Sequence, residues 1–242
     1  MKIFTSLDDV MTTIRGAFCL GARTFTTPMV DQQPNNGRTT VWVTCGIPGV
    51  GKTTISEAIR SAYPPFHCAV VSRDEIRTDI LWDLRKLGPE VQERSLKHMD
   101  RLTSIEVQDR VGRMLDEENQ KHWSAIVIDG CHTDYKTLEG LLIFLGQFGS
   151  KVLIHLMLIG DHDSVCFHAI NDRKEGDYSD YGPHGHHQAL PDCVVKRKRA
   201  EMKDLLDNHF KCLLDRVDDL YWLRECAGRP PFSQYYRENQ SK

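Results

Sequence analysis

The sequence lacks the features of disulfide-stapled, membrane-spanning and strongly polyanion-binding proteins. Its eight cysteines include no C-x-x-C pair, and Cys45 and Cys68 stand in apolar runs where a thiol acts as a small hydrophobe. We therefore expect free thiols in a reducing cytoplasm. No stretch approaches the roughly eighteen apolar residues of a membrane span, and the first residues show no signal-peptide pattern, so we expect no membrane partner. With a formal charge of −3, any contact with a polyanion must be local.

Length and composition predict one α/β domain with insertions. Of the 242 residues, 40% are hydrophobic and 27% are charged, which is typical of a globular chain. Residues 1–38 form a predicted N-terminal extension, because a polar loop signal ending at Gly37 precedes the first strong strand pattern. The predicted domain covers residues 39–228, including a lid and insert at about 166–190. A Pro-, Gln- and Asn-rich tail follows at 229–242.

Strand and helix patterns alternate through this domain, which predicts a mostly parallel sheet covered by helices on both faces. The expected strands are residues 40–44, 67–72, 124–129, 151–159 and a short fifth at 220–223. The expected helices start at Lys52 and Asp74 and cover about 89–122, 135–148 and 191–217. In the long helix 89–122, apolar side chains recur at helical spacing, and we expect that stripe to pack in the core.

The most informative stretch is residues 46–54, Gly-Ile-Pro-Gly-Val-Gly-Lys-Thr-Thr, which fits the phosphate-binding pattern G-x-x-x-x-G-K-[ST]. It lies between a predicted strand and a predicted helix, as this motif requires. Lys52 is expected to contact the β- and γ-phosphates, and the Thr53 hydroxyl to bind Mg²⁺. We therefore predict ATP and Mg²⁺ as cofactors. The predicted nucleotide-binding residues are Gly46, Gly49, Val50, Gly51, Lys52, Thr53 and Thr54.

Two acidic segments lie at predicted strand ends, where ligands of an open α/β sheet gather. Asp74 can accept a proton from an attacking hydroxyl, and Arg77, on the same helix face, can bind an acceptor phosphate. The alternative is a helix-capping aspartate with a surface arginine. Asp129 ends a run of four apolar residues, as an acid near Mg²⁺ or the acceptor does in P-loop enzymes, although acids also start ordinary loops.

A third segment, Asn-Asp-Arg-Lys-Glu-Gly at residues 171–176, is basic and follows the fourth predicted strand. In a lid, such a segment neutralises charge on the transferred phosphoryl group. We predict Arg173 as the catalytic lid residue, with Lys174 as the alternative. The alternative is that these charged residues have no function and are simply exposed to solvent at a helix end.

Two further stretches allow several interpretations. The insert at residues 178–187 contains His184, His186 and His187, which suit a zinc site, a base-stacking surface or a solvent loop. Residues 196–199, Lys-Arg-Lys-Arg, suit either a solvated helix start or contact with a phosphate backbone.

The glycine loop, the Ser-Arg-Asp-x-x-Arg segment at 72–77, Asp129 and the basic segment at Arg173 together resemble the kinase domain of the phage polynucleotide kinases, over roughly residues 40–215. The resemblance implies a P-loop kinase that transfers the γ-phosphate of ATP to a hydroxyl on a nucleic acid, with DNA preferred over RNA. It also implies Asp74 as general base, Arg77 as the acceptor-phosphate clamp and Asp129 as a second acid. A phage enzyme would act in the host cytoplasm.

The sequence departs from that family at several points. It shows no Asp-x-Asp-x-Thr/Val phosphatase signature, and it adds the extension at 1–38 and the insert at 177–190. Phage kinases that phosphorylate 5-hydroxymethyluracil bases within DNA fit the same residues, as do zeta-toxin-like kinases of small metabolites. A motor or switch ATPase is disfavoured, because the extra helical domain and distal arginine sensor of ring ATPases are not found.

Overall fold

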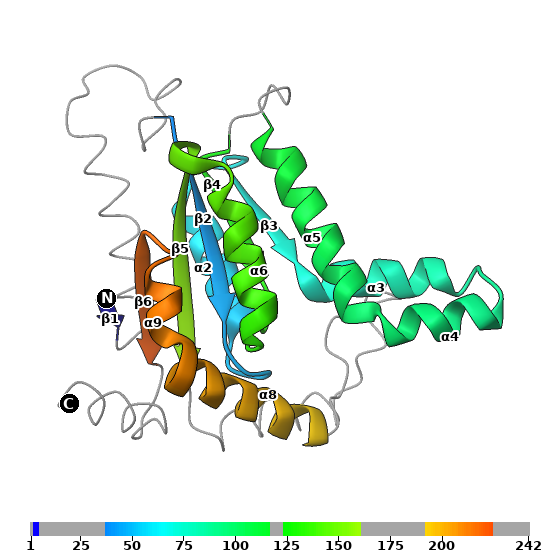
Figure 1. Cartoon of the computed structure of the whole chain (residues 1–242). Coiled ribbons are helices and arrows are strands. Elements are labelled where there is room, and N and C mark those ends of the chain that lie inside the picture. The colour runs from blue at the N-terminus through cyan, green and yellow to red at the C-terminus, as the bar shows by residue number, and fades with distance from the viewer. Residues whose placement is uncertain (1, 5–36, 117–122, 161–191, 225–242) are drawn as a thin grey trace, which may run out of the picture.

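The computed structural model describes residues 2–4, 37–116, 123–160 and 192–224 (Figure 1). The predicted lid with Arg173 and Lys174, the histidine insert and the predicted tail all lie outside these ranges.

Six parallel strands form one sheet in the order β1-β6-β5-β2-β4-β3. The strands are β1 (Lys2–Phe4), β2 (Thr39–Cys45), β3 (Cys68–Ser72), β4 (Ala125–Asp129), β5 (Val152–Gly160) and β6 (Asp219–Arg224). The five predicted strands are therefore confirmed. β1, which lies within the predicted N-terminal extension, was not predicted, since its three residues are too few to form a strand pattern.

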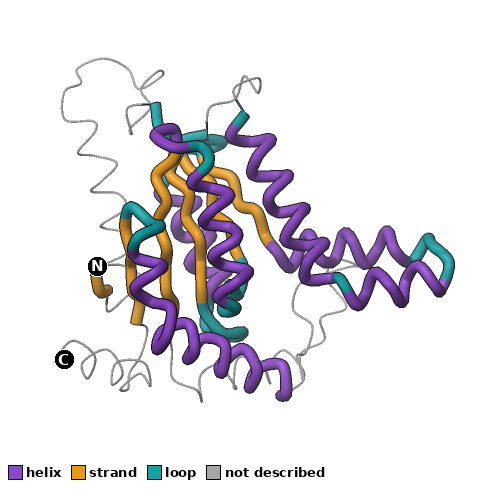
Figure 2. Tube along the Cα trace, viewed as in Figure 1, coloured by secondary structure: helices purple, strands orange, loops and turns teal. Residues whose placement is uncertain are grey.

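Helices cover both faces of this sheet, as predicted (Figure 2). They are α2 (Lys52–Ala62), α3 (Arg73–Leu84), α4 (Pro89–Lys97), α5 (Met99–Leu115), α6 (Tyr135–Gly146), α8 (Asp192–Asp204) and α9 (Phe210–Leu214). In Figure 1, α2 lies behind the sheet while α5 and α6 lie in front, and α8 crosses beneath the carboxyl ends of the strands. The described segments after β2, β3 and β4, which carry predicted functional residues, therefore meet at this lower edge.

The core is centred on β2, β4 and β5. Val43, Ile128 and Leu156 are each 0% exposed. The three residues of β4 that precede Ile128 are also 0% exposed. Because helices lie on both faces, side chains of these strands are buried in both directions, which explains their continuous apolar sequences.

The predicted long helix 89–122 is wrong as a single element. It is broken at His98 into α4 and α5, and α4 folds back beside α3 to form an arm that projects away from the sheet (Figure 1). Val91, the first residue of the predicted core stripe, is 48% exposed, whereas Val111, a stripe residue on α5, is 0% exposed. The stripe packs in the core only where α5 reaches the sheet, because the arm has no sheet face beneath it.

The described cysteines, Cys45, Cys68, Cys131, Cys193 and Cys212, are all free. Within the described ranges, every helix is too short or too polar to cross a lipid bilayer.

Candidate active site

The glycine loop connects β2 to α2 with the backbone that its glycines permit. Gly49 and Gly51 have φ values of 82° and 84°, a region that side chains disfavour. At Gly46, an added Cβ would lie 2.6 Å from the Ile159 carbonyl oxygen, so no larger residue fits. The N-terminus of α2 has no side-chain cap and no acid in its first turn. Its backbone N–H groups are therefore available for an anion.

Lys52 supplies a buried positive charge at this helix terminus. Its side chain is 9% exposed, and Nζ donates a hydrogen bond to the Ile47 carbonyl oxygen at 2.8 Å. Among the described residues it forms no ion pair. A buried ammonium without a counterion is unfavourable, so the loop is suited to bind an anion such as a phosphate.

Asp129, at the end of β4, lies beside the hydroxyl that was predicted to bind magnesium. The Thr53 hydroxyl donates to Asp129 Oδ2 at 3.1 Å, and the Thr44 hydroxyl lies 3.1 Å from Oδ1. Asp129 is 6% exposed, so its carboxylate is held in one orientation. A hydroxyl and a carboxylate oxygen in contact are the hard ligands that Mg²⁺ prefers, and this pair fits the ion. Thr44, the next-to-last residue of the neighbouring strand β2, was not predicted to take part.

Asp74 and Arg77 lie on the first turns of α3, which begins at the end of β3. Ser72 caps this helix by accepting a hydrogen bond from the Glu75 N–H at 3.3 Å, so Asp74 is not its cap. The exposed Asp74 carboxylate has no hydrogen-bond partner in the described ranges. Among the described residues, Arg77 makes an exposed ion pair with Asp100 at 3.6 Å, the kind of contact that contributes little and is easily exchanged.

Two further residues meet beside Asp129 and were missed by the sequence analysis. Ser72 and Asp129 are paired in register, so Arg73 follows directly beside the loop after β4. A Cβ on Gly130 would lie 2.5 Å from Arg73 Cδ and 2.8 Å from His132 Cε1, so both side chains pack on this glycine. Burial lowers the pKa of the Arg73 guanidinium, and the Asp100 charge opposes that shift. Arg73 belongs to the Ser-Arg-Asp-x-x-Arg segment at 72–77 but was assigned no role there, and no sequence signal marked His132.

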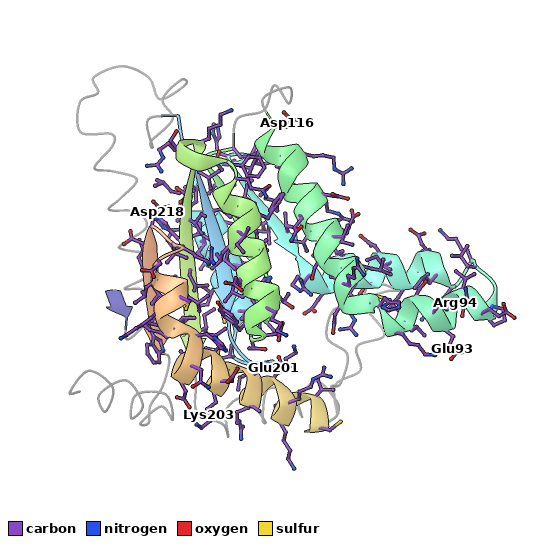
Figure 3. All side chains as sticks on the ribbon, viewed as in Figure 1. Glu93, Arg94, Asp116, Glu201, Lys203 and Asp218 are labelled. Atoms are coloured by element: carbon purple, nitrogen blue, oxygen red, sulfur yellow. The ribbon has the colours of Figure 1, made fainter. Side chains whose placement is uncertain are left out.

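The loop after β4 is also tied to α8. The Thr133 hydroxyl and Lys198 Nζ both contact Glu201 Oε2 at 2.8 Å. Figure 3 shows Glu201 on α8 beneath the ends of the strands. Lys198 is thus engaged inside the protein, whereas Lys196 and Arg197 are exposed. The predicted basic patch is split between two helix faces, and its contact with a phosphate backbone stays a prediction.

A family model describes residues 41–205 as an AAA domain, which is well over half of the chain. The chain belongs to this family, AAA_33. It is a P-loop kinase-like family, so the coarse prediction of a P-loop kinase fold is confirmed. Such kinases generally use ATP and Mg²⁺, which agrees with the loop and the Thr53–Asp129 pair. A search of curated proteins found no match.

Solved structures give only distant likenesses. The PezAT toxin–antitoxin system of Streptococcus pneumoniae has 14% identity and a TM-score of 0.49, covering 88% of this chain and 76% of the other. The AvrRxo1-ORF1:-ORF2 complex with ATP has 13% identity and a TM-score of 0.47, covering 87% and 57%. A provisionally assigned kinase from Chloroflexus aurantiacus has 11% identity and a TM-score of 0.47, covering 84% and 97%. Similarity this distant says nothing about the acceptor of this chain, and none of it points to phage polynucleotide kinases.

Proposed function

We propose that this chain is an ATP-dependent kinase that transfers the γ-phosphate to a hydroxyl on a nucleic acid, with DNA preferred over RNA. The observation that carries the proposal is Lys52, a buried ammonium at an uncapped helix N-terminus that forms no ion pair with any described residue. It stands next to Thr53 and Asp129, which suit Mg²⁺. These residues account for the binding of a nucleoside triphosphate, and the residues at the start of α3 account for the acceptor.

On the ATP side, the N–H groups of the glycine loop and Lys52 bind the β- and γ-phosphates. Lys52 leaves the Ile47 carbonyl for the phosphates, because an anion is the stronger acceptor. Thr53 and Asp129 would hold Mg²⁺, which supplies further charge neutralisation on the phosphates.

On the acceptor side, Asp74 takes the proton of the attacking hydroxyl. The hydroxyl oxygen bonds to the γ-phosphorus as the bond to the ADP oxygen breaks, and ADP leaves. Arg77 exchanges its exposed pair with Asp100 for a phosphate that flanks the hydroxyl. Arg173, in the predicted lid, would neutralise charge on the transferred group.

The distribution of exposed basic residues supports a polynucleotide acceptor. Arg77 on α3, and Lys196 and Arg197 on α8, are exposed on elements at the carboxyl edge of the sheet. α8 runs along this edge in Figure 1. Such residues suit a chain of phosphates better than one small metabolite.

The test is the salt dependence of the acceptor KM, measured with γ-labelled ATP and a single-stranded oligodeoxynucleotide bearing a 5′-hydroxyl. Arg77→Ala should raise the oligonucleotide KM about 30-fold, because losing the charged hydrogen bonds between a guanidinium group and a phosphate costs about 2 kcal/mol. The ATP KM should not change. The slope of log KM against log salt should fall by about 0.7, the value for one phosphate of a single strand.

The matched control is Arg94→Ala, since Arg94 lies at the far end of the projecting arm (Figure 3). It should leave both KM values unchanged. The nucleic-acid acceptor would be refuted if phosphate transfer occurs but the acceptor KM changes neither with salt nor in Arg77→Ala. Duplex DNA with hydroxymethylated bases, RNA and a metabolite pool, assayed in parallel, would then identify which acceptor replaces it.

A further inference from the structure

His132 is held in a strained and fixed position close to Asp129. Its φ is 41°, in the left-handed region that few residues other than glycine adopt, and its side chain is 4% exposed. The backbone carbonyl of His132 accepts a hydrogen bond from Cys45 Sγ at 3.2 Å. A strained, buried residue at a strand end is a candidate for a functional role.

The hydrogen bond on one ring nitrogen decides the state of the other. Nδ1 lies 2.8 Å from the Thr44 carbonyl oxygen, which can only accept, so Nδ1 carries the proton. Burial, assisted by the positive charges of Arg73 and Lys52, lowers the pKa of His132 to about 3. The neutral ring therefore presents Nε2 as an acceptor. This atom is buried and has no hydrogen-bond partner in the described part of the protein.

Arg73 is the complementary group beside it. Its guanidinium donates one hydrogen bond, to the neutral Ser104 hydroxyl at 3.0 Å, and pairs with no carboxylate in the described ranges. Since His132 Cε1 and Arg73 Cδ would both crowd a Cβ on Gly130, Nε2, bonded to Cε1, lies close to the Arg73 side chain. Within the described ranges, a guanidinium with no direct carboxylate contact and a ring nitrogen with no donor are thus neighbours, at the loop that follows Asp129 and one residue from Asp74.

We infer that Arg73 and His132 form a two-point recognition site for the acceptor, in which Arg73 binds an anionic oxygen and His132 Nε2 accepts a hydrogen bond from a hydroxyl or N–H of the same nucleotide. The inference rests on the proposed function. The donor is not the attacking hydroxyl, whose single proton goes to Asp74. A phosphodiester oxygen together with a base N–H or a sugar hydroxyl supplies both partners.

Two substitutions at His132 separate its two ring nitrogens. His132→Asn keeps an N–H where Nδ1 bonds Thr44 and tolerates the positive φ, but it lacks an acceptor at the Nε2 position. His132→Gln places an amide oxygen near the Nε2 position. Arg73→Gln removes the cation. His98→Asn, an exposed histidine where α4 meets α5, is the matched control.

With the 5′-hydroxyl oligodeoxynucleotide, His132→Asn should raise the acceptor KM about 10-fold, the effect of one lost hydrogen bond to a desolvated group. The ATP KM and the thermal midpoint should stay near those of the wild type. His132→Gln should recover most of the loss, and His98→Asn should match the wild type. In the double variant of His132→Asn with Arg73→Gln, the acceptor KM should rise by less than the product of the two single-variant rises, because both groups bind the same nucleotide.

An unchanged acceptor KM in His132→Asn, with active wild-type protein, would overturn this inference alone. An equal rise of both KM values with a lowered thermal midpoint would also overturn it, since the ring would then be structural. Wild-type protein that binds ATP but phosphorylates no oligonucleotide would remove the proposed function, and the two-point site with it.

Discussion

Protonation of His132 should make the fold acid-sensitive by a predictable amount. The pKa of this ring is lowered to about 3 in the native protein, against an ordinary value of 6.5. The unfolded chain therefore binds one proton more than the native chain between these two values. The free energy of unfolding contributed by the neutral ring is fully present above pH 6.5 and is lost as the pH falls. At pH 5, which is about 1.5 units below the unfolded value, the loss reaches about 2 kcal/mol.

Urea unfolding at pH 7 and at pH 5 measures this loss. Other titrating groups change the unfolding free energy of wild type and variant alike, so the difference between the two proteins isolates His132. Wild-type protein should lose about 2 kcal/mol more than His132→Asn over this interval. His98→Asn should behave as the wild type does. Equal losses in wild type and His132→Asn would show that the ring accepts a proton in the native state, and the fixed Nε2 acceptor would be refuted.

Two further substitutions test the donor and acceptor sides. Lys52→Ala should abolish phosphate transfer with an unchanged circular dichroism spectrum, because Lys52 binds phosphates and its contact with Ile47 is dispensable; normal turnover would disprove the loop assignment. Asp74→Asn should lower kcat about 100-fold or more with ATP affinity intact, the pattern for loss of a general base. Loss of ATP binding with normal transfer from the bound nucleotide would instead assign Asp74 a structural role.

The parallel sheet and the donor side of the site could be predicted because their signals are local. Each strand is a short apolar run, and residues 46–54 carry the loop, the lysine and the hydroxyl in one continuous motif. The contact between Thr53 and Asp129 requires only that β2 and β4 be neighbours, since both residues follow strand ends. β2 and β4 are neighbours in the sheet, so Thr53 and Asp129 lie in contact, whereas the sequence placed Asp129 near either Mg²⁺ or the acceptor.

Other features depend on packing that no local pattern encodes. β1 has only three residues and exists because it pairs with β6, more than two hundred positions away. The sequence 89–115 has helical periodicity throughout, and the break at His98 arises where the arm leaves the sheet. His132 gave no signal because histidine at positive φ is uncommon, and its ring is placed by the Thr44 carbonyl from another strand.

The acceptor side was therefore harder to predict than the donor side for a physical reason. In the proposed function, the triphosphate is bound by backbone N–H groups and one lysine from a single loop, whereas the residues proposed to face the acceptor come from separate strand ends. Asp74 and Arg73 follow β3, and His132 follows β4. Their relation depends on the register of Ser72 with Asp129 and on the missing Cβ of Gly130. A substitution at Gly130 would displace Arg73 and His132, and it would also disturb the start of the glycine loop, because the Cys131 carbonyl accepts a hydrogen bond from the Gly46 N–H at 2.9 Å.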